Sequence, residues 1–142
     1  DPRLSECTFQ IACDVNNPLC GETGASMVFG PQKGATEEMA EELDRALLHF
    51  SNLVKRDLGK DTADLPGSGA AGGLGYAFRT FLNGSLEPGI SIIMEAVGLE
   101  EELQNADIVI TGEGRLDGQT AMGKAPVGVA KLAAEYGLTG EK

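Results

Sequence analysis

The stretch from Ala106 to Gly128, ADIVITGEGRLDGQTAMGKAPVG, constrains the fold more than any other part of this 142-residue chain. It starts with an apolar, β-branched run, Asp107 to Thr111, which predicts a buried strand. A charged, glycine-rich loop follows, and residues 125–136 then show the apolar spacing of a helix. A strand, a loop and a helix make up two thirds of a βαβ unit, which a second parallel strand completes. We therefore expect residues 106–142 to form a partial, Rossmann-like βα segment.

The preceding residues, 1–105, show signals for both strands and helices. Their strongest element is a helix over residues 37–58, where apolar side chains recur every three or four positions. Thr36 is the expected N-cap of this helix, and Gly59 suits the position just after its end. Further elements are expected as a strand at 6–15, a short apolar segment at 26–29, helices at 70–82 and 90–97, and a helical turn at 99–103. The predicted fold class is α/β, a mixed domain followed by an incomplete Rossmann-like unit.

Charge and cysteine content exclude several classes of function. The formal net charge of −11 argues against non-specific binding of nucleic acid or of an anionic membrane surface. The three cysteines form no Cys-x-x-Cys pair, and His49 is the single histidine, so neither a disulfide framework, a zinc site nor a Ser-His-Asp triad is expected. With no secretory leader or membrane-spanning stretch, a cytoplasmic location is the simplest expectation. The start at Asp1, without Met, suggests a piece of a longer protein.

The loop from Gly112 to Lys124 is the first candidate for chemistry, because it lies at the expected carboxyl end of a strand. Glu113 and Asp117 supply the hard oxygen ligands that Mg²⁺ prefers. Arg115 and Lys124 could contact phosphate or carboxylate oxygens. The alternative is an exposed loop with ordinary surface charges.

The run GSGAAGGLG, residues 67–75, is the second candidate. A glycine-rich turn that opens a helix is a natural anion site, because backbone N–H groups and the helix dipole face outward. The alternative is that small residues let a helix pack closely. A dinucleotide fingerprint is weak here, since neither a good strand nor a suitably placed acidic residue accompanies the glycines. The nucleotide- or phosphate-binding candidates are Gly67, Gly69, Gly72 and Gly73.

Two further loops carry polar groups beside predicted element ends. Lys33 stands just ahead of the predicted helix at 37–58 and could face an anion, or it could simply be solvated. Asp14 and Asn17 lie in CDVNNPLCG, where a carboxylate flanked by amides could bind hydroxyl groups. Ordinary turn chemistry explains the same residues equally well. Acids, cations, amides and glycines without a nucleophilic triad fit phosphoryl transfer, which depends on positioning and charge.

Four stretches together resemble the bacterial glycerate kinases of the type I family. They are ACDVNNPLCGETGAS (12–26), FGPQKGAT (29–36), PGSGAAGGLG (66–75) and DIVITGEGRLDGQTAMGKAPVGVA (107–130), and the match runs in order over essentially the whole chain. The resemblance implies ATP-dependent phosphorylation of glycerate to 2-phosphoglycerate, with Mg²⁺. It also implies a Rossmann-like domain formed from both ends of a longer chain, with residues 1–105 inserted in its middle.

Under this resemblance we assign the candidate residues to roles at a site in the cleft between the two domains. Glu113 and Asp117 are assigned to Mg²⁺ binding or to base catalysis. Lys33 and Arg115 are assigned to phosphate or to the glycerate carboxylate, and Asp14 and Asn17 to the glycerate hydroxyls. The segment alone is expected to be inactive, since part of the site is absent. Two alternatives stay open: another nucleotide- or sugar-phosphate-binding enzyme, and a non-catalytic domain that self-associates.

Overall fold

The computed structural model describes residues 1–112 and 125–138. The chain divides into two compact units, residues 1–87 and 88–142, and each is described by itself. The predicted partition into an inserted domain and a Rossmann-like segment concerns a longer protein and stays a prediction. None of the helices in the two described ranges is both long enough and apolar enough to cross a membrane.

The long helix of the first unit is α2, Glu37–Leu58, with the predicted bounds. The Thr36 side chain accepts a hydrogen bond from the Met39 N–H at 3.2 Å, as expected of an N-cap. Gly59 ends the helix in the left-handed conformation at φ 66°, which glycine adopts without strain. Both ends of α2 are therefore fixed by residues within one turn of them.

The only sheet in the described residues is a parallel pair, β1 (Gln10–Ala12) with β2 (Ser85–Glu87). Ile11 lies opposite Leu86 in this register. The predicted strand at 6–15 is therefore too long, and β2 was not predicted. Pro88 follows β2 and lacks the N–H group that a longer ladder would need. In place of the start of the predicted strand, residues 2–6 form a 3₁₀ helix, η1 (Pro2–Glu6).

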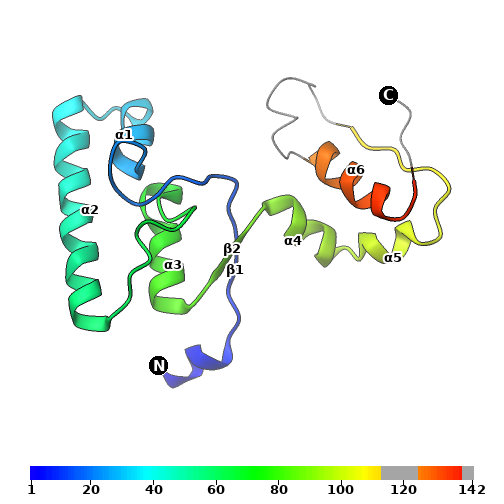
Figure 1. Ribbon diagram of the computed structural model, residues 1–142, viewed down its shortest axis with the longest axis horizontal. Coiled ribbons are helices and arrows are strands. Elements are labelled where there is room, and N and C mark those ends of the chain that lie inside the picture. The colour runs from blue at the N-terminus through cyan, green and yellow to red at the C-terminus, as the bar shows by residue number, and fades with distance from the viewer. Residues whose placement is uncertain (113–124, 139–142) are drawn as a thin grey trace. The chain divides into compact units, whose positions relative to one another are not determined.

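Short helices before and after α2 complete the connection between the two strands. The apolar segment predicted at 26–29 forms α1, Ala25–Phe29, followed by the 3₁₀ turn η2, Pro31–Lys33. The helix predicted at 70–82 is divided into the turn η3, Ala70–Gly72, and α3, Leu74–Leu82. Gly73 separates them because its φ of 105° is incompatible with a continuous right-handed helix. Figure 1 shows α2 at the edge of this unit, with α1 and α3 on one side of it.

The core of the first unit joins α2 and α3 to the loop after β1. Leu19, Val54 and Tyr76 are buried together. The Tyr76 ring meets Phe50 and Phe81 edge-on, at centroid distances of 6.3 and 6.4 Å. Such edge-to-face pairs contribute beyond the area that they bury. The loops that carry the candidate site are thus attached directly to the core.

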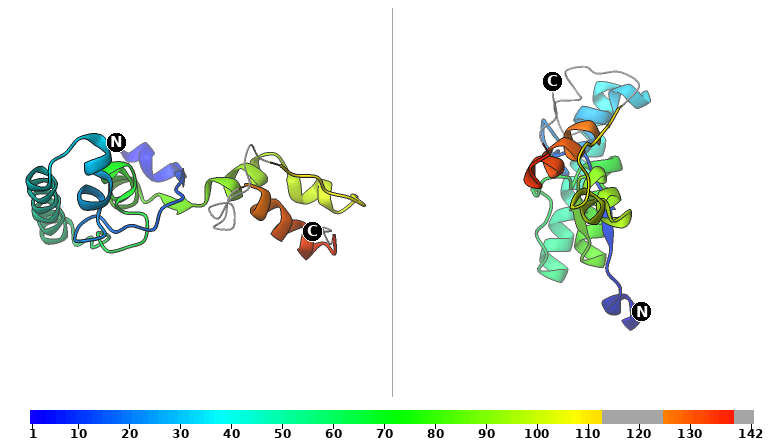
Figure 2. Two further views of the ribbon diagram at one scale, coloured as in Figure 1. Left: turned by 90° about the horizontal axis from the view of Figure 1, so that it is seen from above. Right: turned by 90° about the vertical axis from the view of Figure 1, so that its right-hand side faces the viewer.

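The second unit contains α4 (Gly89–Ala96), α5 (Leu99–Leu103) and α6 (Ala125–Glu135), close to the predicted helices. A Cβ atom at Gly128 would lie 2.8 Å from Cγ1 of Ile90, so α6 and α4 approach closely at this glycine. The views in Figure 2 agree that α6 lies beside α4.

The predicted strand Asp107–Thr111 is wrong for this chain, because these residues adopt neither helix nor strand. Ile108 and Ile110 are 78% and 92% exposed. Among the described residues nothing pairs with this run, and an extended segment without a neighbour cannot satisfy its backbone hydrogen bonds in a sheet.

Candidate functional site

Two of the predicted site loops are joined in the structure. One is the loop after β1, residues 13–24, and the other is the glycine-rich loop before α3, residues 66–73. We call these two loops the paired loops. The Gly69 N–H donates to the Asn17 carbonyl at 2.9 Å. The Cys13 N–H donates to the Glu87 carbonyl at 2.8 Å, which fixes the first loop at the carboxyl end of both strands. This is the edge of a parallel sheet where α/β proteins bind ligands.

Close packing explains why glycine stands in the second loop. A Cβ atom at Gly69 would lie 2.3 Å from the Pro18 carbonyl oxygen, and one at Gly67 would lie 2.9 Å from Cδ2 of Leu86. Gly72, by contrast, has a φ of 73° and open space around its missing side chain. Gly67 and Gly69 therefore have a packing role, which was the alternative considered from the sequence. A phosphate contact at Gly67, Gly69, Gly72 and Gly73 stays a prediction.

The amino end of α3 faces the same loops. The Tyr76 N–H donates to the Ser68 carbonyl at 2.9 Å, and the Ala77 N–H to the Gly73 carbonyl at 3.0 Å. Within the two described ranges, the N–H groups of Leu74 and Gly75 have no backbone or side-chain acceptor. First-turn N–H groups of this kind carry the positive end of the helix dipole and can bind an anion.

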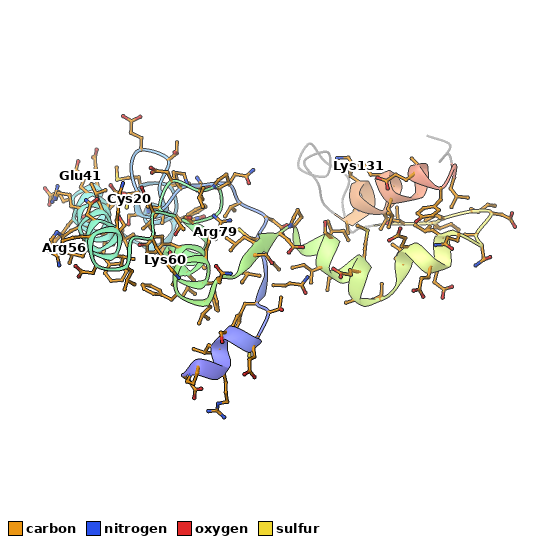
Figure 3. All side chains as sticks on the ribbon, turned by 60° about the horizontal axis from the view of Figure 1, so that its bottom comes forward. Cys20, Glu41, Arg56, Lys60, Arg79 and Lys131 are labelled. Atoms are coloured by element: carbon orange, nitrogen blue, oxygen red, sulfur yellow. The ribbon has the colours of Figure 1, made fainter. Side chains whose placement is uncertain are left out.

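Arg79 is a cation beside the paired loops that the sequence reasoning missed. It lies on α3, one turn after Gly75, and its Nη1 donates to the Pro66 carbonyl at 3.0 Å. The same nitrogen lies 3.4 Å from Oγ of Ser68, a fully buried side chain. Figure 3 shows Arg79 on the α3 side of this unit. Its place on a helix hid it, since only the fold brings that helix face to residues 66–68.

Asp14 and Asn17, the two candidate residues of the first loop, differ in how far they are exposed to solvent. Asp14 is exposed, whereas Asn17 is half-buried. The Asn17 side chain donates from Nδ2 to the Thr23 carbonyl at 2.8 Å and so closes the loop on itself. A hydrogen bond within the turn thus uses the Nδ2 group of the Asn17 amide. Hydroxyl binding by Asp14 and Asn17 stays a prediction.

Lys33 is exposed on η2, next to the start of α2. Its ammonium group makes no ion pair or hydrogen bond within the described part of the chain. The structure therefore leaves it as a solvated cation that no contact attaches to the paired loops.

The remaining candidates, Glu113, Arg115, Asp117 and Lys124, lie outside the described residues. In residues 1–112 and 125–138, no group of three or more His, Cys, Asp or Glu side chains could hold a metal ion. The predicted Mg²⁺ ligands, Glu113 and Asp117, are therefore untested, although carboxylates are chemically suited to Mg²⁺.

Cys20 lies in the first of the paired loops and should be slow to react. Burial, and then the negative charges of Asp44 and Asp64, raise the pKa of its thiol to about 11. Because the thiolate is the reactive form, we expect alkylation by iodoacetamide at pH 8.5 to be roughly 50- to 100-fold slower than for an unperturbed thiol. Mass spectrometry of the time course checks this, with the exposed Cys7 as reference. Equal rates for the two thiols would contradict the burial argument.

Comparison with known proteins places this geometry in a family. Residues 1–139 match the model of the "Glycerate kinase family". The chain is 53% identical to a glycerate kinase of Halalkalibacterium halodurans over 138 residues, which cover 97% of this chain and 36% of the relative. It is 52% identical to the glycerate 2-kinase of Escherichia coli, over 96% of this chain and 36% of that protein.

A solved structure agrees with these relatives. It is described as a "putative glycerate kinase 2" from Salmonella typhimurium LT2 and is 56% identical to this chain. The TM-score is 0.88, over 96% of this chain and 36% of the other. The chain thus spans about a third of the length of the proteins that it matches. Since the family model covers nearly all of its residues, the chain belongs to the glycerate kinase family.

Proposed function

We propose that the protein of which this sequence forms a part transfers a phosphoryl group from ATP to glycerate and releases 2-phosphoglycerate. The observation that carries this proposal is the 52% identity to a glycerate 2-kinase over 136 residues. The match covers 96% of this chain, which carries the paired loops and the residues that follow Asp107.

The paired loops support a role in holding an anionic substrate group. Two first-turn N–H groups of α3, those of Leu74 and Gly75, have no acceptor among the described residues. Arg79 adds a planar cation with further donors beside the same loop. Phosphoryl transfer depends mainly on such positioning and charge stabilisation. We assign the phosphate-binding role to Gly72, Gly73 and Lys124, together with Arg79.

The other site residues keep the roles that their chemistry suits. Glu113 and Asp117 would hold Mg²⁺, which shields the charge of the transferred group when it is bound. Asp117 would also orient the attacking glycerate hydroxyl. Arg115 and Lys33 would bind the glycerate carboxylate, and Asp14 and Asn17 its hydroxyl groups.

A chimera tests this proposal directly. The matching segment of the Escherichia coli glycerate 2-kinase, 36% of that protein, is replaced by residues 1–142 of this chain. We expect ADP formation that requires both ATP and glycerate, measured by a coupled assay, and no such activity from the 142-residue chain alone. A folded chimera that ignores glycerate but hydrolyses ATP would favour another nucleotide-dependent enzyme. A folded chimera without either activity would overturn the proposal.

A further inference from the structure

The carboxylate of Asp44 connects α2 to the first of the paired loops. Both of its oxygens accept from the Gly21 N–H, Oδ1 at 3.0 Å and Oδ2 at 3.2 Å. The two residues are 23 positions apart in sequence, so the contact forms only when α2 packs against this loop. Figure 1 shows α1, which follows the loop, beside the first half of α2. Because a charged acceptor makes a stronger hydrogen bond than a neutral one, Asp44 is well suited to hold Gly21 in place.

Gly21 begins a tight turn that holds the side chain of Asn17. The Gly24 N–H donates to the Gly21 carbonyl at 2.8 Å, which closes the turn over residues 21–24. Inside the turn, the Thr23 carbonyl accepts from Nδ2 of Asn17 at 2.8 Å. A shift of Gly21 would therefore move the group to which the Asn17 amide is bonded.

The Asn17 amide keeps one polar atom that a ligand could use. Its Nδ2 is bonded to Thr23, whereas its Oδ1 accepts no hydrogen bond from the described part of the chain. An amide oxygen accepts a hydrogen bond from a hydroxyl group, which is the part of glycerate assigned to Asn17 above. The Asn17 backbone is also fixed, because its carbonyl accepts from the Gly69 N–H at 2.9 Å. Oδ1 is thus held at one position by contacts on both sides of the residue.

The second of the paired loops has supports that do not involve Asp44. The Ser68 hydroxyl, which is fully buried, donates to the Thr62 carbonyl at 2.6 Å. The Ser68 carbonyl accepts from the Tyr76 N–H at 2.9 Å. Loss of the Asp44 carboxylate should therefore disturb the first loop, which is assigned to glycerate, more than the loop that is assigned to the phosphates.

We propose that Asp44 is a positioning residue for glycerate binding, because its hold on the turn at residues 21–24 fixes the Asn17 amide. The inference rests on the proposed function and adds to it a residue outside the four sequence stretches that resemble the family. Asp44 does not touch the substrate; it acts through Gly21 and Asn17. Holding a binding group in the right place before the substrate arrives lowers the cost of binding.

Steady-state kinetics of the chimera described above test the proposal. Asp44→Ala should raise the KM for glycerate about tenfold and leave the KM for ATP within about twofold, as expected when one substrate loses a binding group. A general loss of stability would instead lower the amount of active enzyme, and with it the apparent kcat, but would change neither KM. Asp44→Asn keeps an acceptor oxygen and should hold the KM for glycerate within about threefold of the unmodified chimera.

Asp57→Ala is the matched control. It removes the same carboxylate from the same helix, at a position where the group is paired with the neighbouring Arg56 at 2.6 Å. Both partners of that pair are more than half exposed, so the substitution should leave both KM values within about twofold.

Cys20, next to Gly21 in the sequence, provides a readout that does not depend on activity. Burial is the largest cause of the raised pKa of its thiol, and the negative charge of Asp44 is the next. Asp44→Asn removes that charge, so alkylation of Cys20 by iodoacetamide at pH 8.5 should become about two- to fivefold faster. Mass spectrometry of the Cys20 peptide from the chimera measures the rate, and Asp57→Ala should not change it.

The possible outcomes separate this inference from the proposed function. A chimera without glycerate-dependent activity would overturn the proposed function and this inference with it. An active chimera in which Asp44→Ala leaves the KM for glycerate unchanged, or raises both KM values equally, would overturn the inference alone. An unchanged alkylation rate of Cys20 in Asp44→Asn would also overturn it, since the carboxylate would then not lie against the loop.

Discussion

Replacing Gly75 by alanine should destabilise the unit formed by residues 1–87 by about 3 kcal/mol, because the added methyl group meets backbone that cannot move. Gly75 is buried in the first turn of α3. A Cβ atom there would lie 2.1 Å from the Gly67 carbonyl oxygen and 3.1 Å from Cδ2 of Leu86. Any relief requires the glycine-rich loop to separate from α3, which would also lengthen the hydrogen bond from Tyr76 to Ser68.

Two effects of this substitution oppose each other, and their relative sizes decide whether the free energy of unfolding rises or falls. Alanine is favoured over glycine inside a helix by about 1 kcal/mol. The steric cost at a backbone oxygen is larger, so the net change should lower the melting temperature by roughly 10 °C or more for a unit of this size. Thermal unfolding followed by circular dichroism measures it. Gly112→Ala is the control, since nothing lies within 4 Å of its Cβ position. An unchanged or higher melting temperature for Gly75→Ala would contradict the packing of the paired loops.

Asp117→Asn should lower kcat of the active chimera by about 10²- to 10⁴-fold, the range found when a group that handles a proton or positions the reacting atoms is neutralised. The substitution keeps the size of the side chain and removes its negative charge. If Asp117 also binds Mg²⁺, the concentration of Mg²⁺ needed for half-maximal rate should rise. Steady-state kinetics at varied Mg²⁺ separate these two effects.

The matched control for this variant is Asp107→Asn, an exposed aspartate just ahead of the same loop. It makes the same change in charge and should leave kcat within about twofold, as expected for a surface substitution. Unchanged kcat and Mg²⁺ dependence in Asp117→Asn would remove Asp117 from the mechanism. Glycerate kinase activity itself would still stand in that case, because the unmodified chimera tests it separately.

The elements that were predicted well are those whose signals are local. The bounds of α2 follow from Thr36 and Gly59, each within one turn of a helix end. Its apolar spacing identified the helix but did not separate the buried residues Ala40 and Val54 from exposed ones such as Met39 and Leu43. Periodicity does not state what lies opposite each face of a helix. Helix α6 was likewise predicted from its own residues.

The features that were missed depend on distant parts of the chain. Strand β2 is three residues long, and its only strand partner in the described part of the chain is β1, far away in sequence. The strand predicted at Asp107–Thr111 has the right residues but lacks a neighbour among those described. In the candidate site, the contact of Gly69 with Pro18 arises only once the two loops meet, and the contact of Arg79 with Pro66 arises only once α3 packs against the loop before it.

The pairing of β1 with β2 also has a consequence for how the first unit folds. Residues 10–12 must find residues 85–87 across nearly the whole unit, and the entropy lost in closing so long a loop is recovered only when the strands join. Helix α2, held by caps at both ends, can form from local contacts well before this. We therefore expect the two-stranded ladder, and with it the edge that presents the paired loops, to be the last part of the unit to assemble.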